Sequence, residues 1–150
     1  MNSILVHQID GVLSSRLLTV SADALLVDVS SKLSETHIGL ALVCDSAGSM
    51  VGIIAKTNIV RQIGRSCDRL GTTVASDVMT RDVTTCHPSD ALLDVLSTMK
   101  ISGFVHLPVI DERSKPSGVV YSGDALRALM VEGEYEADLL REYVMGIGYQ

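Results

Sequence analysis

The strongest constraint on the fold is an internal repeat with a period of 66 residues. Residues 19–63 align without a gap against residues 85–129, and the identical pairs include Thr19/Thr85, Leu26/Leu92, Asp28/Asp94, Ser31/Ser97, Val43/Val109, Asp45/Asp111, Gly52/Gly118 and Arg61/Arg127. Self-similarity at a fixed period means that one supersecondary unit occurs twice, and that neither copy covers its apolar surface alone. We therefore expect two similar copies that pack together with pseudo-two-fold symmetry.

The sequence of each copy predicts a strand followed by a helix. Short β-prone pieces lie at 17–20 and 83–86, and the segments after them carry apolar residues at helical spacing. Ser89, which follows Pro88, is the expected N-cap of the second of these helices.

Two further strands and a helix complete each copy. Apolar runs of strand length occupy 38–44 and 104–110, and a short polar turn after each run predicts an antiparallel hairpin. Closing helices are expected over 56–65 and from 122 onward, with a break at Gly133. The expected class is α+β, built from tandem β-α-β-β-α repeats.

Composition limits the classes of function. The 150 residues are 47% hydrophobic and only 3% aromatic, and no stretch has the eighteen or so apolar residues of a membrane span. The first residues lack the basic and apolar regions of a secretory signal, so we expect a cytoplasmic protein. The net charge of -6, without a basic run, disfavours nucleic-acid binding.

The cysteines and histidines predict neither a disulfide framework nor a metal site. The three cysteines form no C-x-x-C pair, and an odd number in a short chain favours reduced thiols. The four histidines, His7, His37, His87 and His106, lack the spacing of metal ligands.

Three motifs resemble those of the cystathionine-β-synthase (CBS) domain family. The stretch 78–83 (VMTRDV) is similar to the entry motif ahead of a CBS repeat, and 106–111 (HLPVID) is similar to the family's central strand. The stretch 118–124 (GVVYSGD) resembles the strand-to-helix motif that ends in aspartate. The resemblance predicts one CBS-pair module over 1–150, with repeats at about 12–66 and 76–132. It also predicts a short leading helix and a long acidic closing helix that ends near residue 146.

The resemblance implies a regulatory module that binds AMP, ADP, ATP or a related compound such as NAD or S-adenosylmethionine in a cleft between the repeats. In the family the adenine lies against the entry strand, the motif aspartate binds the ribose hydroxyls, and Ser/Thr and basic residues meet phosphate. The predicted site residues are Asp124, Tyr121, Ser122, Gly123, His106, Pro108, Arg81, Val83, Thr85, Asn58, Thr57 and Lys56.

Both copies depart from the family motif, the first copy more than the second. In the second copy Asp124 keeps the ribose position, although Tyr121 replaces Ser/Thr and Val105 replaces the usual arginine. Asp124 as a helix-capping charge and His106 as a packed strand residue remain alternatives. In the first copy Ala55 replaces the hydroxyl and Asn58 replaces the aspartate, so we expect the first site to be weaker or vestigial.

Three functions are open at this point. The first is a nucleotide sensor, which forms a homodimer, needs no cofactor and acts on an unknown protein partner in trans. The second is a scaffold of the same fold that binds no nucleotide and only dimerises or docks. The third is an enzyme that uses His106 and Asp124, which is disfavoured because the sequence contains no nucleophile elbow, metal cluster or P-loop.

Overall fold

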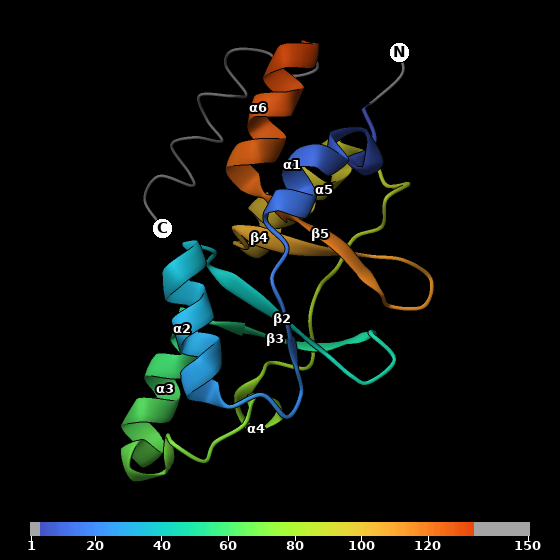
Figure 1. The fold of residues 1–150 in the computed structure, drawn as a ribbon. Coiled ribbons are helices and arrows are strands. Elements are labelled where there is room, and N and C mark those ends of the chain that lie inside the picture. The colour runs from blue at the N-terminus through green and yellow to red at the C-terminus, as the bar shows by residue number, and fades with distance from the viewer. Residues whose placement is uncertain (1–3, 134–150) are drawn as a thin grey trace. The chain divides into compact units, whose positions relative to one another are not determined.

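The computed structural model describes residues 4–133, which divide into two compact units (Figure 1). Within the described residues, unit 1 consists of 4–15, 85–111 and 117–133, and unit 2 consists of 16–84 and 112–116. Unit 2 therefore holds the first repeat, whereas unit 1 holds most of the second repeat together with the start of the chain.

Unit 2 has the predicted strand-helix-strand-strand-helix order. Its elements are β1 (Thr19–Ser21), α2 (Leu26–Thr36), β2 (Leu40–Cys44), β3 (Met50–Ala55), α3 (Lys56–Ser66), η2 (Cys67–Arg69) and α4 (Ala75–Val78). The sheet order is β1-β2-β3, with β1 parallel and β3 antiparallel to β2. Both the hairpin and the helices of the first repeat are confirmed.

Unit 1 repeats most of this order after a short N-terminal pair of helices. Its elements are η1 (Val6–Ile9), α1 (Asp10–Ser15), α5 (Leu92–Ser102), β4 (His106–Ile110), β5 (Pro116–Tyr121) and α6 (Ser122–Glu132). Strands β4 and β5 form a two-stranded sheet, and their five-residue connection is too short for a parallel crossover. Helix α6 ends at Glu132, and its C-cap residue Gly133 is in the left-handed conformation with φ of 70°, so the predicted end of this segment at Gly133 is confirmed. The rest of the predicted closing helix lies outside the described residues.

The entry strand predicted at 83–86 is wrong, because the second repeat has only one isolated bridge there, between Cys86 and Val109. In the first repeat the ladder continues on both sides through hydrogen bonds from Leu42 N to Leu18 O and from Ala22 N to Cys44 O. The repeat period replaces the two donors, Leu42 and Ala22, by Pro108 and Pro88. Proline has no N–H, so neither bond forms in the second repeat and the strand is lost.

The predicted N-cap at Ser89 is also wrong. Helix α5 begins at Leu92, and its N-cap residue, Ala91, makes no side-chain capping bond. The residues ahead of it form a turn instead, in which Asp90 Oδ2 accepts a hydrogen bond of 2.8 Å from His87 N. This turn satisfies backbone groups before the helix and moves its start three residues beyond Ser89.

The segment ahead of each repeat pairs with the other repeat. In unit 2, which contains the first repeat, the carbonyl of Thr73 accepts a bond from Leu26 N, and Ala75 N donates to Ala24 O. In unit 1 the N-terminal segment does the same for the second repeat, since Ile4 O accepts from Leu92 N and Val6 N donates to Asp90 O. The first helix of each repeat, α2 or α5, is therefore hydrogen-bonded at its start to the segment that precedes the other repeat.

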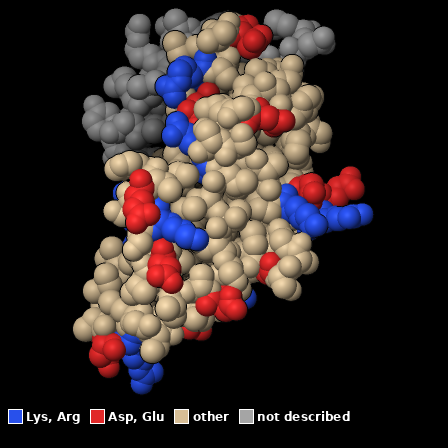
Figure 2. Space-filling model, in the orientation of Figure 1, with Lys and Arg blue, Asp and Glu red and all other residues tan. Residues whose placement is uncertain are grey.

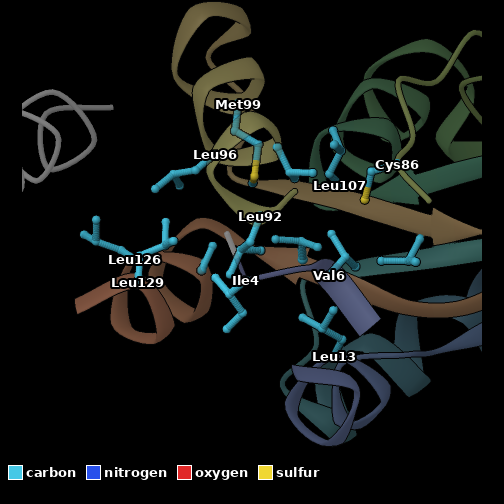
Figure 3. Close-up of a cluster of buried hydrophobic side chains, with 14 residues drawn as sticks. Ile4, Val6, Leu13, Cys86, Leu92, Leu96, Met99, Leu107, Leu126 and Leu129 are labelled. Atoms are coloured by element: carbon cyan, nitrogen blue, oxygen red, sulfur yellow. The ribbon is translucent and has the colours of Figure 1, made fainter. Parts of the chain in front are cut away.

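Aliphatic side chains build a separate core in each unit. In unit 1 the N-terminal segment, α5, β4 and α6 contribute buried residues to one cluster (Figure 3), among them Val6, Leu13, Leu92, Leu96, Met99, Leu107 and Leu129. In unit 2 the cluster includes Val20, Leu26, Val29, Leu33, Ala41, Val43, Ile54 and Ala75. The helical stripes predicted from spacing, Leu26/Val29/Leu33 and Leu92/Val95/Leu96/Met99, are buried as expected.

The repeated glycines lie where an entry segment crosses a strand. A Cβ atom on Gly52 in β3 would be 2.9 Å from Thr80 O, and one on Gly118 in β5 would be 2.8 Å from Leu13 O. Real Cβ atoms do not approach backbone atoms this closely. The identity Gly52/Gly118 in the repeat is therefore explained by close backbone approach rather than by turn geometry.

Candidate functional site

Asp124 lies in the first turn of α6, directly after β5, and its side chain is only 3% exposed. Its Oδ1 atom accepts a hydrogen bond of 3.0 Å from Nη2 of Arg127, whose side chain is 70% exposed. The N-terminal end of a helix interacts favourably with a carboxylate, and Arg127 adds a charge-assisted hydrogen bond. Asp124 is thus a buried, oriented carboxylate at a helix start.

His106 and Tyr121 form an aromatic pair in the same unit. Their ring centroids lie 5.0 Å apart at an interplanar angle of 68°, which is an edge-to-face contact. Burial lowers the pKa of His106 below its usual value, because the charged imidazolium loses solvation. At neutral pH the ring is therefore uncharged and can offer one N–H donor, but no positive charge for a phosphate.

The first two residues of α6 differ in their surroundings. Ser122 is buried, and its backbone N–H donates to Val105 O at 3.0 Å. Gly123 is exposed, and a Cβ atom there would meet nothing within 4 Å. The backbone at Gly123 is therefore open to an approaching group, whereas Ser122 bonds the start of α6 to the residue before β4.

Thr85 and Pro108 lie where the second entry segment meets β4. Pro108 O accepts a hydrogen bond of 2.9 Å from Cys86 N. Thr85 lines a pocket of about 240 Å³ in unit 1, together with Cys86, Asp90, Ala91, Asp94, Val95, Thr98 and Leu107. Burial, and secondarily the nearby Asp90 carboxylate, raises the pKa of Cys86 to about 12, so this thiol stays protonated.

Asn58 in unit 2 uses both amide N–H groups and its amide oxygen for internal hydrogen bonds. Oδ1 accepts from Ala55 N at 2.9 Å, and Nδ2 donates to Val78 O and to Thr80 Oγ1, both at 3.0 Å. These bonds close the start of α3 and tie it to the segment after α4. A ligand could accept a hydrogen bond from Nδ2 only by displacing one of them, whereas Oδ1 keeps a second lone pair.

The remaining predicted residues of unit 2 are less enclosed. Lys56 and Thr57 are exposed in the first turn of α3, and Val83 is half-buried. Arg81 is exposed, and its Nη2 donates to Ser76 O at 3.3 Å. Arg81 and Val83 belong to the unit that contains Asn58, not to the unit that contains Asp124.

The sequence prediction missed Arg127, Thr80 and Arg61. Arg127 binds the Asp124 carboxylate, and its i,i+3 spacing from Asp124 on a predicted helix was the available signal. Thr80 and Arg61 lie in one pocket with Asn58. The available signal for Arg61 was its identity with Arg127 in the repeat.

Acidic and basic side chains are interspersed on the face shown in Figure 2, with wide uncharged areas between them. Such a surface offers no broad basic field for a nucleic-acid backbone. No helix among residues 4–133 combines the length and apolar character needed to cross a membrane.

A family model for the CBS domain matches residues 8–65 and again residues 75–131. The chain belongs to the CBS domain family. The two matched ranges contain the two repeats, with Asn58 in the first and Asp124 in the second. The family resemblance read from the motifs and the α+β class are therefore both confirmed.

Curated relatives differ widely in how much of their length this CBS chain covers. A 17.7 kDa protein of Acidianus ambivalens is 27% identical over 142 residues, which are 94% of this chain and 84% of that protein. A homoserine O-acetyltransferase of Methanococcoides burtonii is 24% identical over 130 residues, which are 86% of this chain but 26% of that enzyme. CBS repeats similar to these thus also occur within much longer proteins.

Solved CBS-pair structures share the fold. The CBS domain pair of protein MJ0100, in complex with 5'-methylthioadenosine and S-adenosyl-L-methionine, has a TM-score of 0.70 at 23% identity, with 89% of this chain and 100% of that chain covered. CBSX2 in complex with AMP has a TM-score of 0.72 at 20% identity, with 86% and 98% covered.

Proposed function

We propose that this CBS chain is a regulatory module that binds an adenine nucleotide at Asp124 in the second repeat and signals its occupancy to a protein partner in trans. The observation that carries the proposal is the buried Asp124 carboxylate at the start of α6, held by Arg127. A carboxylate can accept both hydrogen bonds of a ribose cis-diol, which is the group that every adenosyl ligand presents.

The surroundings of Asp124 suit a nucleoside. Gly123 leaves open space beside the helix start, and the His106–Tyr121 pair offers aromatic surface and polar ring atoms in the same unit. Two CBS-pair relatives were solved with adenosyl compounds, AMP in one and 5'-methylthioadenosine with S-adenosylmethionine in the other. These ligands support AMP, ADP, ATP or NAD as the class to test.

The module needs no cofactor and performs no catalysis in this proposal, and it acts as a cytoplasmic homodimer. Binding would stabilise one of two conformations by its differential affinity, and the partner would recognise that conformation. His106 and Asp124 have sufficient roles in packing and ligand binding, so no acid-base reaction is assigned to them.

Thermal unfolding with AMP, ADP, ATP and NAD tests this proposal. A ligand at 100 times its dissociation constant adds about 2.7 kcal/mol to the free energy of unfolding, which gives a clear rise in Tm. Asp124→Asn should abolish the rise, whereas Asp28→Asn should keep it, because Asp28 has the same first-turn position in α2 and is exposed in the other unit. A panel of adenylates that leaves Tm unchanged at millimolar concentration would refute the proposal.

The second candidate function is a CBS scaffold that binds no nucleotide and only dimerises or docks to a partner. It is favoured by Asn58, whose two N–H donors are both used inside unit 2, and by Ala55, which offers no hydroxyl. In that case Asp124→Ala changes neither adenylate affinity nor partner binding. The same thermal series therefore decides between the two functions.

A further inference from the structure

We infer that the first repeat carries an oxyanion site on α3, in which Arg61 and Arg65 bind a phosphate group. The site is a groove of about 190 Å³ in unit 2, lined by Asn58, Arg61, Gln62, Arg65, Asp77, Val78, Met79 and Thr80. It runs along one side of α3, where residues three and four apart face the same way, and its other wall is the segment 77–80.

The lining of this groove keeps a net positive charge, because two arginines outweigh one carboxylate. Neither Arg61 nor Arg65 forms a salt bridge with any residue in 4–133. The one carboxylate in the lining, Asp77, accepts a hydrogen bond of 3.3 Å from Val74 N and so caps the start of α4. Two like charges at i,i+4 repel each other on a helix, and a bound anion would relieve that repulsion.

The second repeat contains a corresponding groove whose lining carries no net charge. A pocket of about 240 Å³ in unit 1 is lined by Val12, Asp124, Arg127, Ala128 and Val131. The 66-residue period maps these positions one by one onto Val78, Asn58, Arg61, Gln62 and Arg65.

Two differences between the grooves favour an anion in the first and together outweigh its additional carboxylate, Asp77. Asp124 neutralises Arg127 across 3.0 Å, whereas its counterpart Asn58 is uncharged and turned to Val78 and Thr80. Val131 is replaced by a second arginine, Arg65. Asp77, whose repeat counterpart is Gly11, adds one negative charge, so the lining carries a net charge of +1 in the first groove against 0 in the second.

The donors and the size indicate a phosphate group rather than a whole nucleotide. Arginine pairs with phosphate through two parallel N–H bonds, and Gln62 adds a neutral amide donor at the same wall. Pockets for drug-sized ligands occupy roughly 300–1,000 Å³, which exceeds this groove. The phosphate could be free, as inorganic phosphate or pyrophosphate, or could be the terminal phosphates of a nucleotide whose remainder lies outside.

Isothermal titration of the full chain with pyrophosphate tests the site, at constant ionic strength set with chloride. Wild type should bind pyrophosphate, and Arg61→Gln and Arg65→Gln should each weaken binding about tenfold or more, since hydrogen bonds to charged groups contribute about 1.5–3 kcal/mol. Arg69→Gln is the matched control, because Arg69 is an exposed arginine of unit 2 outside the groove and should keep wild-type affinity.

Parallel titrations with inorganic phosphate, ATP and adenosine distinguish the sources. If ATP loses affinity in the two groove variants and adenosine binds equally to all, the phosphate belongs to a nucleotide; if only phosphate and pyrophosphate respond, it is free. No pyrophosphate binding, or binding that Arg69→Gln weakens as much as Arg61→Gln, overturns the inference. Failure of AMP to bind at Asp124 would overturn the proposed function and leave this result unchanged.

Discussion

Ile53 and Thr80 exchange two backbone hydrogen bonds of 2.9 Å each, so the segment after α4 pairs directly with β3. This pairing draws Thr80 across Gly52, the residue before Ile53, and leaves no room for a side chain there. It also positions the Thr80 hydroxyl for the bond from Asn58. The local structure of the first-repeat groove therefore depends on this one backbone contact.

Gly52→Ala should destabilise the protein. The new methyl group would lie 2.9 Å from the Thr80 carbonyl, and overpacking of this kind costs about 1–3 kcal/mol. Urea unfolding measures the loss in the free energy of unfolding. Gly64→Ala is the control, because Gly64 lies within α3 with open space around it, and alanine there should stabilise the helix by about 1 kcal/mol. Equal free energies for Gly52→Ala and wild type would contradict the close approach.

Most of the secondary structure could be predicted from the sequence because it depends on local patterns. Apolar spacing gave α2 and α5, and the polar turns gave the two hairpins. The absence of a strand at 83–86 could not be predicted from local sequence. It depends on Pro88 and Pro108, which replace the backbone donors of the equivalent strand pairing in the first repeat. The pairing of 4–7 with 88–92, and of 73–76 with 22–26, consists of long-range contacts between short segments that carry no periodicity.

The candidate site was less accessible to sequence reasoning for the same reason. Asp124 could be proposed from the sequence because the strand-to-helix motif that contains it is contiguous. The use of Asn58 as an internal bridge to Val78 and Thr80 requires a tertiary contact over about twenty residues. The groove of Arg61 and Arg65 depends on that contact as well, since the segment 77–80 forms its second wall.

Asn58→Asp should destabilise unit 2, although it introduces the residue type that the second repeat has at the equivalent position, Asp124. A carboxylate can still accept the bond from Ala55 N, but it cannot donate to Val78 O. An acceptor left without its donor costs about 1–3 kcal/mol, which urea unfolding would detect. The control Thr57→Ala changes an exposed neighbour and should stay within about 0.5 kcal/mol of wild type. A variant at position 58 as stable as wild type would show that the bridge contributes little.

The stability of the protein should fall as the solution is acidified through the range in which histidine titrates, in part because of His106. Burial lowers the pKa of His106 in the folded state below its usual value of about 6.5. As the pH falls below that value, the unfolded chain takes up the proton first, so the unfolded state binds more protons and the free energy of unfolding decreases. The contribution is fully present above the unfolded pKa and is progressively lost as the pH falls toward the folded pKa.

His106→Phe keeps an aromatic ring against Tyr121 and removes the titrating group, so its unfolding free energy should depend less steeply on pH between about 7 and 5. Urea unfolding at closely spaced pH values measures both slopes, and NMR titration of the His106 ring gives its pKa directly. Parallel slopes for the two proteins, or a ring that titrates above about 6.5, would contradict the burial of a neutral imidazole.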